Sequence, residues 1–363
     1  MINKENWEDT KKKYQEFWAK ENHDRPLLFI SAPRENYTKK EIKQPDNIEE
    51  RWTDTEYVIK KARNDFNATY YGADAYPNLW PDLGPDILVA YLGSELIFGE
   101  QTSWSTPILN DWGHVKNLRF DSDNKWWQKT VEMTKAMMQD SNGDYMVGIT
   151  DLHPGVDAIA SLRGLSRFCL DLYDNPAEVK EAIFKVLDVF KKTMDLSFEM
   201  TNVSENGTTN WMDIWHPGRY YVTSADILYM ISEQMYDEFL SEELFEEVNW
   251  LEDTIFHLDG VGSLKHLDSL LKIEKLNGIQ WMYGAGQPSA AHWIPELKRI
   301  QEAGKLIQID VMPSDLDILL EELKPEGVMY MVRTHDLKNP IKNEQEAKDI
   351  VKKVEQSFKK SIF

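Results

Sequence analysis

Residues 278–310 contain two short segments, Gly278-Ile-Gln-Trp-Met282 and Leu306-Ile-Gln-Ile-Asp310, separated by the helical pattern Trp293–Ala303. Both segments are bounded by turn residues and are largely apolar, which is typical of strands buried on both faces. A strand, a helix and a second strand in this order predict two parallel strands joined by a crossover. The sequence therefore favours an α/β fold.

The same alternation extends along the rest of the chain. It predicts further strands at Leu27–Ala32, Tyr145–Ile149, Thr209–Asp213, Thr254–Leu258 and Val328–Val332, and an eighth strand hidden within Tyr70–Leu96. Helical patterns cover Trp7–Lys20, Pro176–Glu199, Glu233–Leu251, Asp315–Leu323 and Glu344–Lys360. We expect one (β/α)8 barrel over residues 1–363, with residues 1–25 as an N-terminal helical segment. A doubly wound open sheet is the alternative, but no glycine-rich phosphate motif opens a helix.

The composition excludes several classes of partner. The 363 residues carry 62 acidic and 41 basic side chains, a formal net charge of −21 that repels nucleic acid and anionic membranes. The single cysteine, Cys169, excludes an internal disulfide and a cysteine-cluster metal site. Neither a long apolar run nor a signal peptide is evident, so we expect a cytoplasmic protein with a small-molecule substrate.

Ionisable residues lie at the predicted strand ends, where a barrel of this kind carries its functional groups. They are Asp151, His153, Asp213, His257, Asp259, Asp310, His335 and Asp336. In His257-Leu-Asp-Gly260 the histidine and the aspartate, two residues apart on an extended chain, point to the same side. With His335 as a third ligand they would form a two-histidine, one-carboxylate site for zinc or iron. The alternative is a metal-free acid/base histidine oriented by Asp259.

Two aromatic sets are candidate walls of a substrate site. Around Asp213, an arginine and several rings could enclose a ring or a cationic methylated group: Trp211, Trp215, Arg219, Tyr220 and Tyr221. A second set comprises Tyr76, Trp80, Asp82, Trp104 and Trp112. For both sets, ordinary packing is the alternative.

Several motifs resemble the uroporphyrinogen decarboxylase superfamily. The segment from Met230 to Gln287 contains Met-Ile-Ser-Glu-Gln-Met-Tyr-Asp-Glu-Phe-Leu, then Phe-His-Leu-Asp-Gly, then Ile-Gln-Trp-Met-Tyr-Gly-Ala-Gly-Gln-Pro. The stretches 155–164 and 172–180 are similar to the central strand of that family and to its helix after Asp-Asn-Pro. The resemblance is diffuse, covers most of residues 60–360, and implies a (β/α)8 barrel.

Departures from the family pattern separate its two branches. The decarboxylase grips propionate groups with an Arg-Gln-Ala-Gly-Arg motif, whereas this chain has Arg34 alone, and its Asp-Ser-Trp-Ala-Gly motif is replaced by Met-Asp-Ile-Trp-His-Pro-Gly at 212–218. In the corrinoid methyltransferase branch, zinc ligands follow a His-x-Cys pattern with a later Cys. The matching positions here hold His257, Asp259 and His335, which argues against thiol methylation. The resemblance implies a cobalamin cofactor that is free or carried by a partner protein, because the corrinoid-attaching Asp-x-His-x-x-Gly pattern is absent.

The leading expectation is therefore a methyltransferase acting between a small methylated or methoxylated compound and a corrinoid. Its expected catalytic residues are His257, Asp259, His335, Asp213 and Asp82. The expected substrate-binding residues are Arg34, Trp80, Arg163, Trp215, Arg219, Tyr220 and Tyr283. Two alternatives stay open: a metal-free decarboxylase in which Asp82 or Asp213 works with the three arginines, and a non-catalytic barrel that binds a corrinoid or tetrapyrrole. Barrels of this family often pair, so the resemblance also implies a homodimer.

Overall fold

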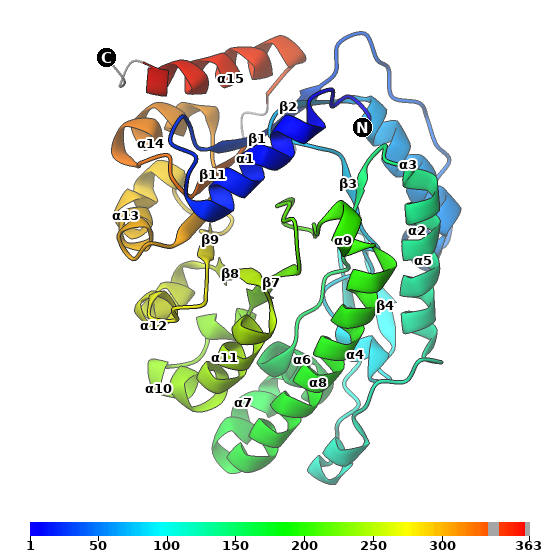
Figure 1. The fold of residues 1–363 in the computed structure, drawn as a ribbon. Coiled ribbons are helices and arrows are strands. Elements are labelled where there is room, and N and C mark those ends of the chain that lie inside the picture. The colour runs from blue at the N-terminus through cyan, green and yellow to red at the C-terminus, as the bar shows by residue number, and fades with distance from the viewer. Residues whose placement is uncertain (333–340, 360–363) are drawn as a thin grey trace.

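Seven strands form the main sheet of the computed structural model, which describes residues 1–332 and 341–359 (Figure 1). The strand order is β2-β1-β11-β10-β9-β8-β7. Their bounds are β1 Leu27–Pro33, β2 Thr69–Ala73, β7 Tyr220–Ser224, β8 Asp253–Asp259, β9 Gly278–Met282, β10 Leu306–Asp310 and β11 Val328–Val332. Only β2 is antiparallel to its neighbour, and the other pairs are parallel. The predicted α/β class with parallel strands is confirmed.

Two shorter pairs of strands lie beside this sheet. β3 (Asn78–Leu79) pairs in parallel with β6 (Met146–Val147), and β4 (Leu96–Phe98) pairs with β5 (Ser103–Ser105) in an antiparallel hairpin. Within residues 1–332 and 341–359, no strand ladder joins these pairs to the main sheet. Of the expected closed barrel, the structure thus confirms the parallel sheet but not its closure.

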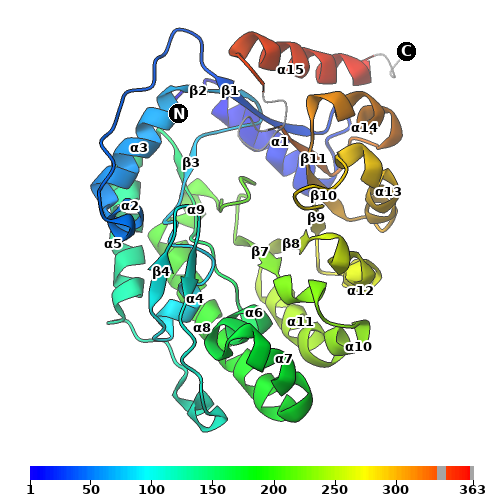
Figure 2. The same cartoon turned by 180° about the vertical axis from the view of Figure 1, so that it is seen from behind.

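Most of the helices lie outside the strands in both ribbon views, whereas α1 (Trp7–Ala19) crosses the inner side of the sheet near β1 and β11 (Figures 1 and 2). The helices before β7 are α1, α2 Ile48–Thr53, α3 Thr55–Asn67, α4 Ile87–Tyr91, α5 Lys125–Ser141, α6 Gly155–Arg163, α7 Leu165–Asp174, α8 Pro176–Met200 and α9 Val203–Asn206. Those after it are α10 Glu233–Met235, α11 Ser241–Trp250, α12 Leu267–Leu271, α13 Ile294–Glu302, α14 Leu316–Glu322 and α15 Glu344–Lys359. None of the helices within the described ranges is long and apolar enough to cross a membrane.

Alternation along each strand separates two apolar layers. Leu28, Phe256, Ile307 and their counterparts belong to the large core shared with the outer helices. Leu27, Ile255, Leu306 and Met329 point to the opposite face and pack with Tyr14 and Phe17 of α1 in a second cluster. Residues two apart on a strand share a face. The inner face is therefore apolar near the amino ends of the strands, where α1 covers it.

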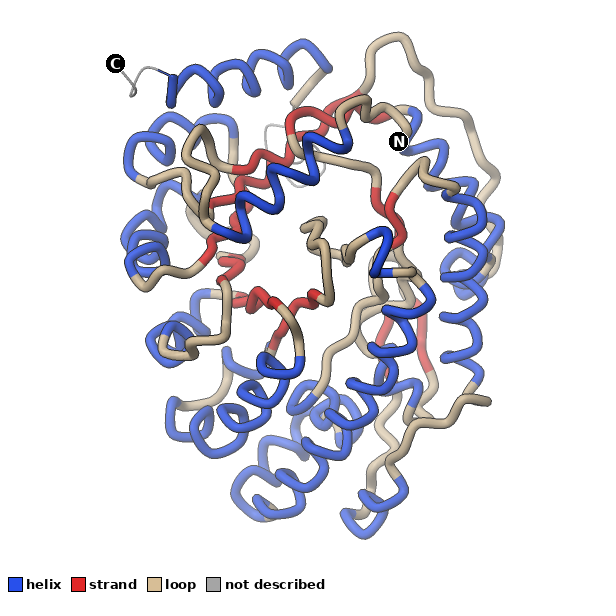
Figure 3. The backbone as a smooth tube through the Cα atoms, in the orientation of Figure 1, coloured by secondary structure: helices blue, strands red, loops and turns tan. Residues whose placement is uncertain are grey.

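The chain departs from the expected elements in two places. Residues 209–213 were expected to be a strand, but they belong to a turn-containing segment between α9 and β7 that packs toward the inner face of the main sheet (Figure 3). Asp213 has a φ of 57°, a left-handed conformation that ends an extended run. The strand expected there is β7 instead. The helix expected over 233–251 is also interrupted, by a π-helical turn at Tyr236–Leu240.

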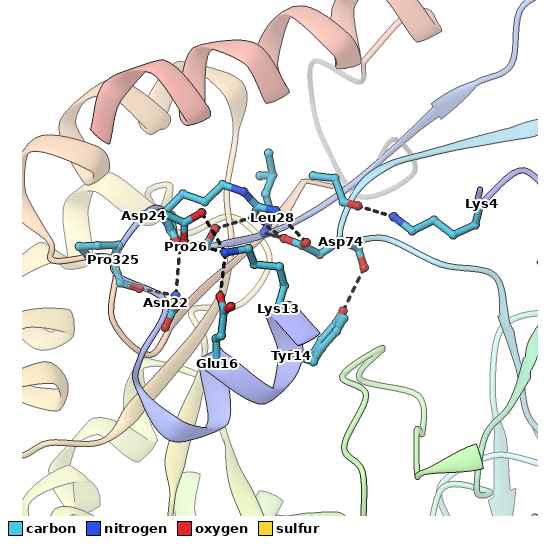
Figure 4. A network of polar contacts seen from close by, with 12 residues as sticks. Lys4, Lys13, Tyr14, Glu16, Asn22, Asp24, Pro26, Leu28, Asp74 and Pro325 are labelled. Carbon is cyan, nitrogen blue, oxygen red and sulfur yellow. Dashed lines mark hydrogen bonds and ion pairs between the residues drawn. The ribbon is translucent and has the colours of Figure 1, made fainter. Parts of the chain in front are cut away.

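A network of buried charges joins the beginning of β1 to the end of β2 (Figure 4). Arg25 Nη1 donates to Asp74 Oδ2 at 2.5 Å, and Nη2 donates to Oδ1 at 2.9 Å. Asp74 Oδ2 also accepts from the backbone N–H of Leu28 at 2.9 Å. Lys4 donates to the carbonyl of Ala73, and burial lowers the pKa of Lys4 to about 8 although the Asp74 charge opposes this. These charges neutralise one another and fasten the amino end of the sheet.

Candidate site at the carboxyl ends of the strands

Polar side chains replace the apolar inner layer toward the carboxyl ends of β7 to β10. They occupy the inward-facing positions that follow the inner apolar residues along the same strands: Ser224, His257, Asp259, Gln280, Gln308 and Asp310. His257 lies opposite Gln280 in the register of β8 with β9, and Gln280 lies opposite Gln308 in the register of β9 with β10. The sheet therefore places a row of polar groups across three adjacent strands.

His257 is held from two sides. Its Nδ1 is hydrogen-bonded to Oε1 of Gln280, and its ring makes an edge-to-face contact with Trp211, with 5.1 Å between ring centroids. Because an amide oxygen only accepts, Nδ1 carries the proton and Nε2 keeps a free lone pair. Gln280 thus sets the tautomer of His257 and leaves one nitrogen available for a ligand or a proton.

Asp226 completes a group with His257 and Asp259. One ligand atom from each of these three residues lies within 4.8 Å of the other two. Asp226 follows β7, and Asp157 Oδ2 accepts from its backbone N–H at 2.7 Å. Burial raises the pKa of Asp226, Asp157 adds to the effect, and the nearby histidines oppose it. Asp226 was not among the expected site residues, because the strand before it had been placed at 209–213.

His153 forms a second cluster beside the first. His153 Nε2 lies 3.1 Å from Asp151 Oδ1, and Nδ1 lies 3.2 Å from Ser224 Oγ and 3.8 Å from Asp157 Oδ2. Burial opposes the charged imidazolium, but the Asp151 charge and hydrogen bond outweigh it and raise the pKa of His153 well above 6.5. A cavity of about 390 Å³ opens onto His153, Asp157 and Asp226.

Two buried glutamates of α11 face this cluster. Glu243 and Glu247 are 6% and 2% exposed, and burial together with the Asp157 charge raises the pKa of Glu243 to about 8. Burial and the Glu243 charge also raise the pKa of Glu247, against the charges of His153 and Lys191. Gly155 allows this close approach, since a Cβ there would lie 1.9 Å from Glu243 Oε1. The carboxyl end of the sheet thus carries an excess of buried acid.

Trp80 and Asp82 line a different cavity of about 400 Å³, together with residues of α2 and α3. The Asp82 side chain is accessible from this cavity, but protein atoms surround its carboxyl group closely. This burial raises the pKa of Asp82, and a hydrogen bond from the Gly84 N–H opposes the rise. The charge of Asp151 also raises the pKa of Asp82. Asp82 is therefore linked electrostatically to the carboxylate that holds His153.

Three other expected residues have distinct surroundings. Asp213 Oδ1 accepts from Asn78 Nδ2 at 2.8 Å. The Tyr283 hydroxyl donates to the Asp310 carbonyl at 3.2 Å just beyond β9, and burial raises its pKa to about 12. Arg34 is exposed directly after β1. His335 lies outside the described residues, so its predicted role as a ligand stays a prediction.

Four residues expected to bind substrate are structural instead. Arg163 is buried, with Nε donating to Asp171 at 2.7 Å and Nη1 donating to the Leu109 carbonyl at 2.6 Å. Arg219 is held by Asp195 and lies over the rings of Phe198 and Trp250.

Tyr220 and Trp215 are buried in the inner apolar cluster, and Tyr220 begins β7 at the end of the strand opposite the site. Trp215, Arg219 and Tyr220 differ from the expectation because they lie before or at the start of β7, whereas a strand at 209–213 would have placed them after its carboxyl end. Arg163 differs because it ends α6 in a buried ion pair with Asp171.

Comparison with known proteins gives a fold but no family. No protein-family profile and no curated protein sequence matches the chain. Among solved structures, the chain is similar to a methyltransferase from Methanosarcina mazei, with a TM-score of 0.62 and 12% sequence identity over 96% of this chain and 99% of that chain. At this identity the likeness shows a shared fold over nearly the whole length of both proteins.

Proposed function

We propose that this chain is an enzyme that transfers a methyl group from a small methylated or methoxylated compound. The observation that carries the proposal is the convergence of His257, Asp259 and Asp226 at the carboxyl ends of β7 and β8. The likeness to a solved methyltransferase and the resemblance to the uroporphyrinogen decarboxylase superfamily support the same class of reaction.

The proposal includes a (β/α)8 barrel in which β3 and β6 fill the gap between β2 and β7. Hydrogen bonds from residues just after β6 support it. Ile149 N donates to the Thr209 carbonyl at 2.9 Å, and Leu152 N donates to the side-chain hydroxyl of Tyr221 in β7 at 2.7 Å. In such a barrel the carboxyl ends of all strands meet at one mouth, where enzymes of this architecture carry their active sites.

The donor set fits a divalent cation. One imidazole nitrogen and two carboxylates are ligands that zinc and ferrous iron accept, and Gln280 orients His257 as outer partners of metal-bound histidines do. His335 stays in the proposal as the second histidine of the expected triad. A bound cation would supply Lewis acidity at the leaving oxygen or nitrogen of the methyl donor.

The chain itself supplies groups that would orient the substrate. Trp211 lies edge-to-face against His257 at the tip of the segment between α9 and β7, where its indole would contact an apolar or cationic methyl group. Arg163 and Arg219 are both held by carboxylates of this chain, so they do not serve a substrate carboxylate. This weighs against the decarboxylase alternative. A corrinoid acceptor, free or on a partner protein, stays part of the proposal.

The test combines metal binding with methyl transfer. The chelator-treated chain is titrated with Zn²⁺ by calorimetry, and methylated amines and methoxylated compounds are assayed with cob(I)alamin by the absorbance of the methylated product. We expect His257→Ala to weaken Zn²⁺ binding about 100-fold or more and to abolish transfer, because it removes the nitrogen ligand. His114→Ala, at an exposed histidine of the 112–117 turn, is the matched control and should change neither.

Two results would contradict the proposal. Unchanged Zn²⁺ affinity and transfer in His257→Ala would remove the site, and no transfer from any donor class by the parent chain would remove the activity.

A further inference from the structure

We propose that His153, Asp157 and Asp226 form a second divalent-cation position, joined to the first by Asp226 as a shared carboxylate. This inference rests on the proposed function, because it extends the site of His257 and Asp259 to two metals. One ligand atom from each residue of this second group lies within 4.8 Å of the others, as in the first group. Asp226 is the member common to both.

His153 has the arrangement of a metal-binding imidazole. Its Nε2 faces Asp151 Oδ1 at 3.1 Å, while Nδ1 is on the side of Asp157 and Ser224. When Nε2–H donates to the carboxylate and a metal ion displaces the proton from Nδ1, Nδ1 offers its lone pair toward the cluster. A carboxylate behind a histidine commonly fixes the tautomer and raises the basicity of a metal ligand. Asp151 thus orients the ring of His153 as Gln280 orients the ring of His257.

Carboxylates gather around His153. Asp157 of α6 lies 3.8 Å from it, and the buried Glu247 of α11 is close enough to interact with it electrostatically. Oε1 of Glu247 has no hydrogen-bond partner among the described residues. A buried carboxylate without a partner is unfavourable unless it takes up a proton or gains a positive neighbour. A divalent ion at His153 would supply that positive charge.

The site is reachable and has room for the ion with its waters or a substrate oxygen. The cavity of about 390 Å³ is lined by His153, Asp157 and Asp226 and also by Asp86 and Ser161. Asp226 itself is exposed. Mixed nitrogen and oxygen ligands suit Zn²⁺, Fe²⁺ or Mn²⁺. In proteins with two metals about 3.5–4 Å apart, the pair clamps both oxygens of a reacting group.

Manganese gives a readout that does not depend on turnover. The chelator-treated chain is titrated with Mn²⁺ by calorimetry, and the loaded chain is measured by electron paramagnetic resonance. We expect two ions per chain and the multiline spectrum of an exchange-coupled pair. His153→Ala and His257→Ala should each retain one ion with an uncoupled six-line spectrum.

Asp226→Asn should lose the coupling, and because this side chain is exposed it tests the bridge even if His153→Ala fails to fold. Asp86→Asn is the matched control: it lines the same cavity but bonds Ser161 Oγ and Ser105 N, so it should keep both ions.

The outcomes separate the two proposals. One ion per parent chain, unchanged in His153→Ala, would overturn the second position and leave the proposed function standing. Two uncoupled ions that persist in Asp226→Asn would overturn the shared carboxylate. Two coupled ions in a chain that transfers no methyl group would support the second position and contradict the proposed reaction.

Discussion

Buried charged groups have different partners at the two ends of the main sheet. At the amino end, Asp74 is surrounded by Arg25 and Lys4, and both of its oxygens accept hydrogen bonds (Figure 4). At the carboxyl end, the acids outnumber the cationic groups around His153, and the pKa of Glu243 is raised to about 8 by burial and Asp157. The paired charges at the amino end stabilise the fold, whereas the excess of acids at the carboxyl end is available to bind a ligand.

Breaking the amino-end network should have the largest effect. Asp74→Asn leaves the buried guanidinium of Arg25 without its carboxylate, so we expect the free energy of unfolding to fall by about 3 kcal/mol. Urea denaturation followed by circular dichroism measures this. Asp24→Asn, which removes an exposed partner of Lys13, is the control and should cost less than about 1 kcal/mol. Equal losses in the two variants would mean that burial does not distinguish them.

Removing one acid at the carboxyl end should change how stability depends on pH. Between its ordinary pKa of 4.5 and its folded value of about 8, Glu243 holds a proton in the folded chain that the unfolded chain has released. The parent therefore loses stability as pH rises through this window. With chelator present, Glu243→Gln should be more stable than the parent by about 2 kcal/mol at pH 9, with no such gain at pH 4.

Denaturation at both pH values measures the gain, and Glu242→Gln, at an exposed neighbour on the same helix, should show none. A gain of the same size at pH 4 and pH 9 would mean that Glu243 is not the titrating group.

Removing a neutral polar group from the site should have the smallest effect. Gln308 is fully buried, and neither its Oε1 nor its Nε2 has a partner among the described residues. Gln308→Leu should therefore raise the free energy of unfolding by about 1 kcal/mol. Gln280→Leu is the contrast, since it removes the hydrogen bond to His257 and should weaken Zn²⁺ binding about 10-fold. A destabilised Gln308→Leu chain would show that this amide is already satisfied in solution.

The sequence was most informative where local pattern and tertiary environment agree. β9, β10 and β11 have the predicted bounds because each is a short apolar run buried on both faces. His257 and Asp259 share a face of β8 for the same local reason, the two-residue repeat of a strand. The pattern was misleading at 209–213, where Asp213 adopts a positive φ that no periodicity reveals.

The sequence alone determined the α/β class, the parallel strands and the pairing of His257 with Asp259. These features depend on composition, on periodicity and on the shared face of residues two apart along a strand. Only the tertiary structure brought Asp226, His153 and Glu243 together, because they come from the ends of β7, β6 and the helix α11, distant in the chain. It also assigned Arg163 and Arg219 to internal ion pairs. Which buried charges find a partner depends on packing between distant elements, and no local pattern encodes it.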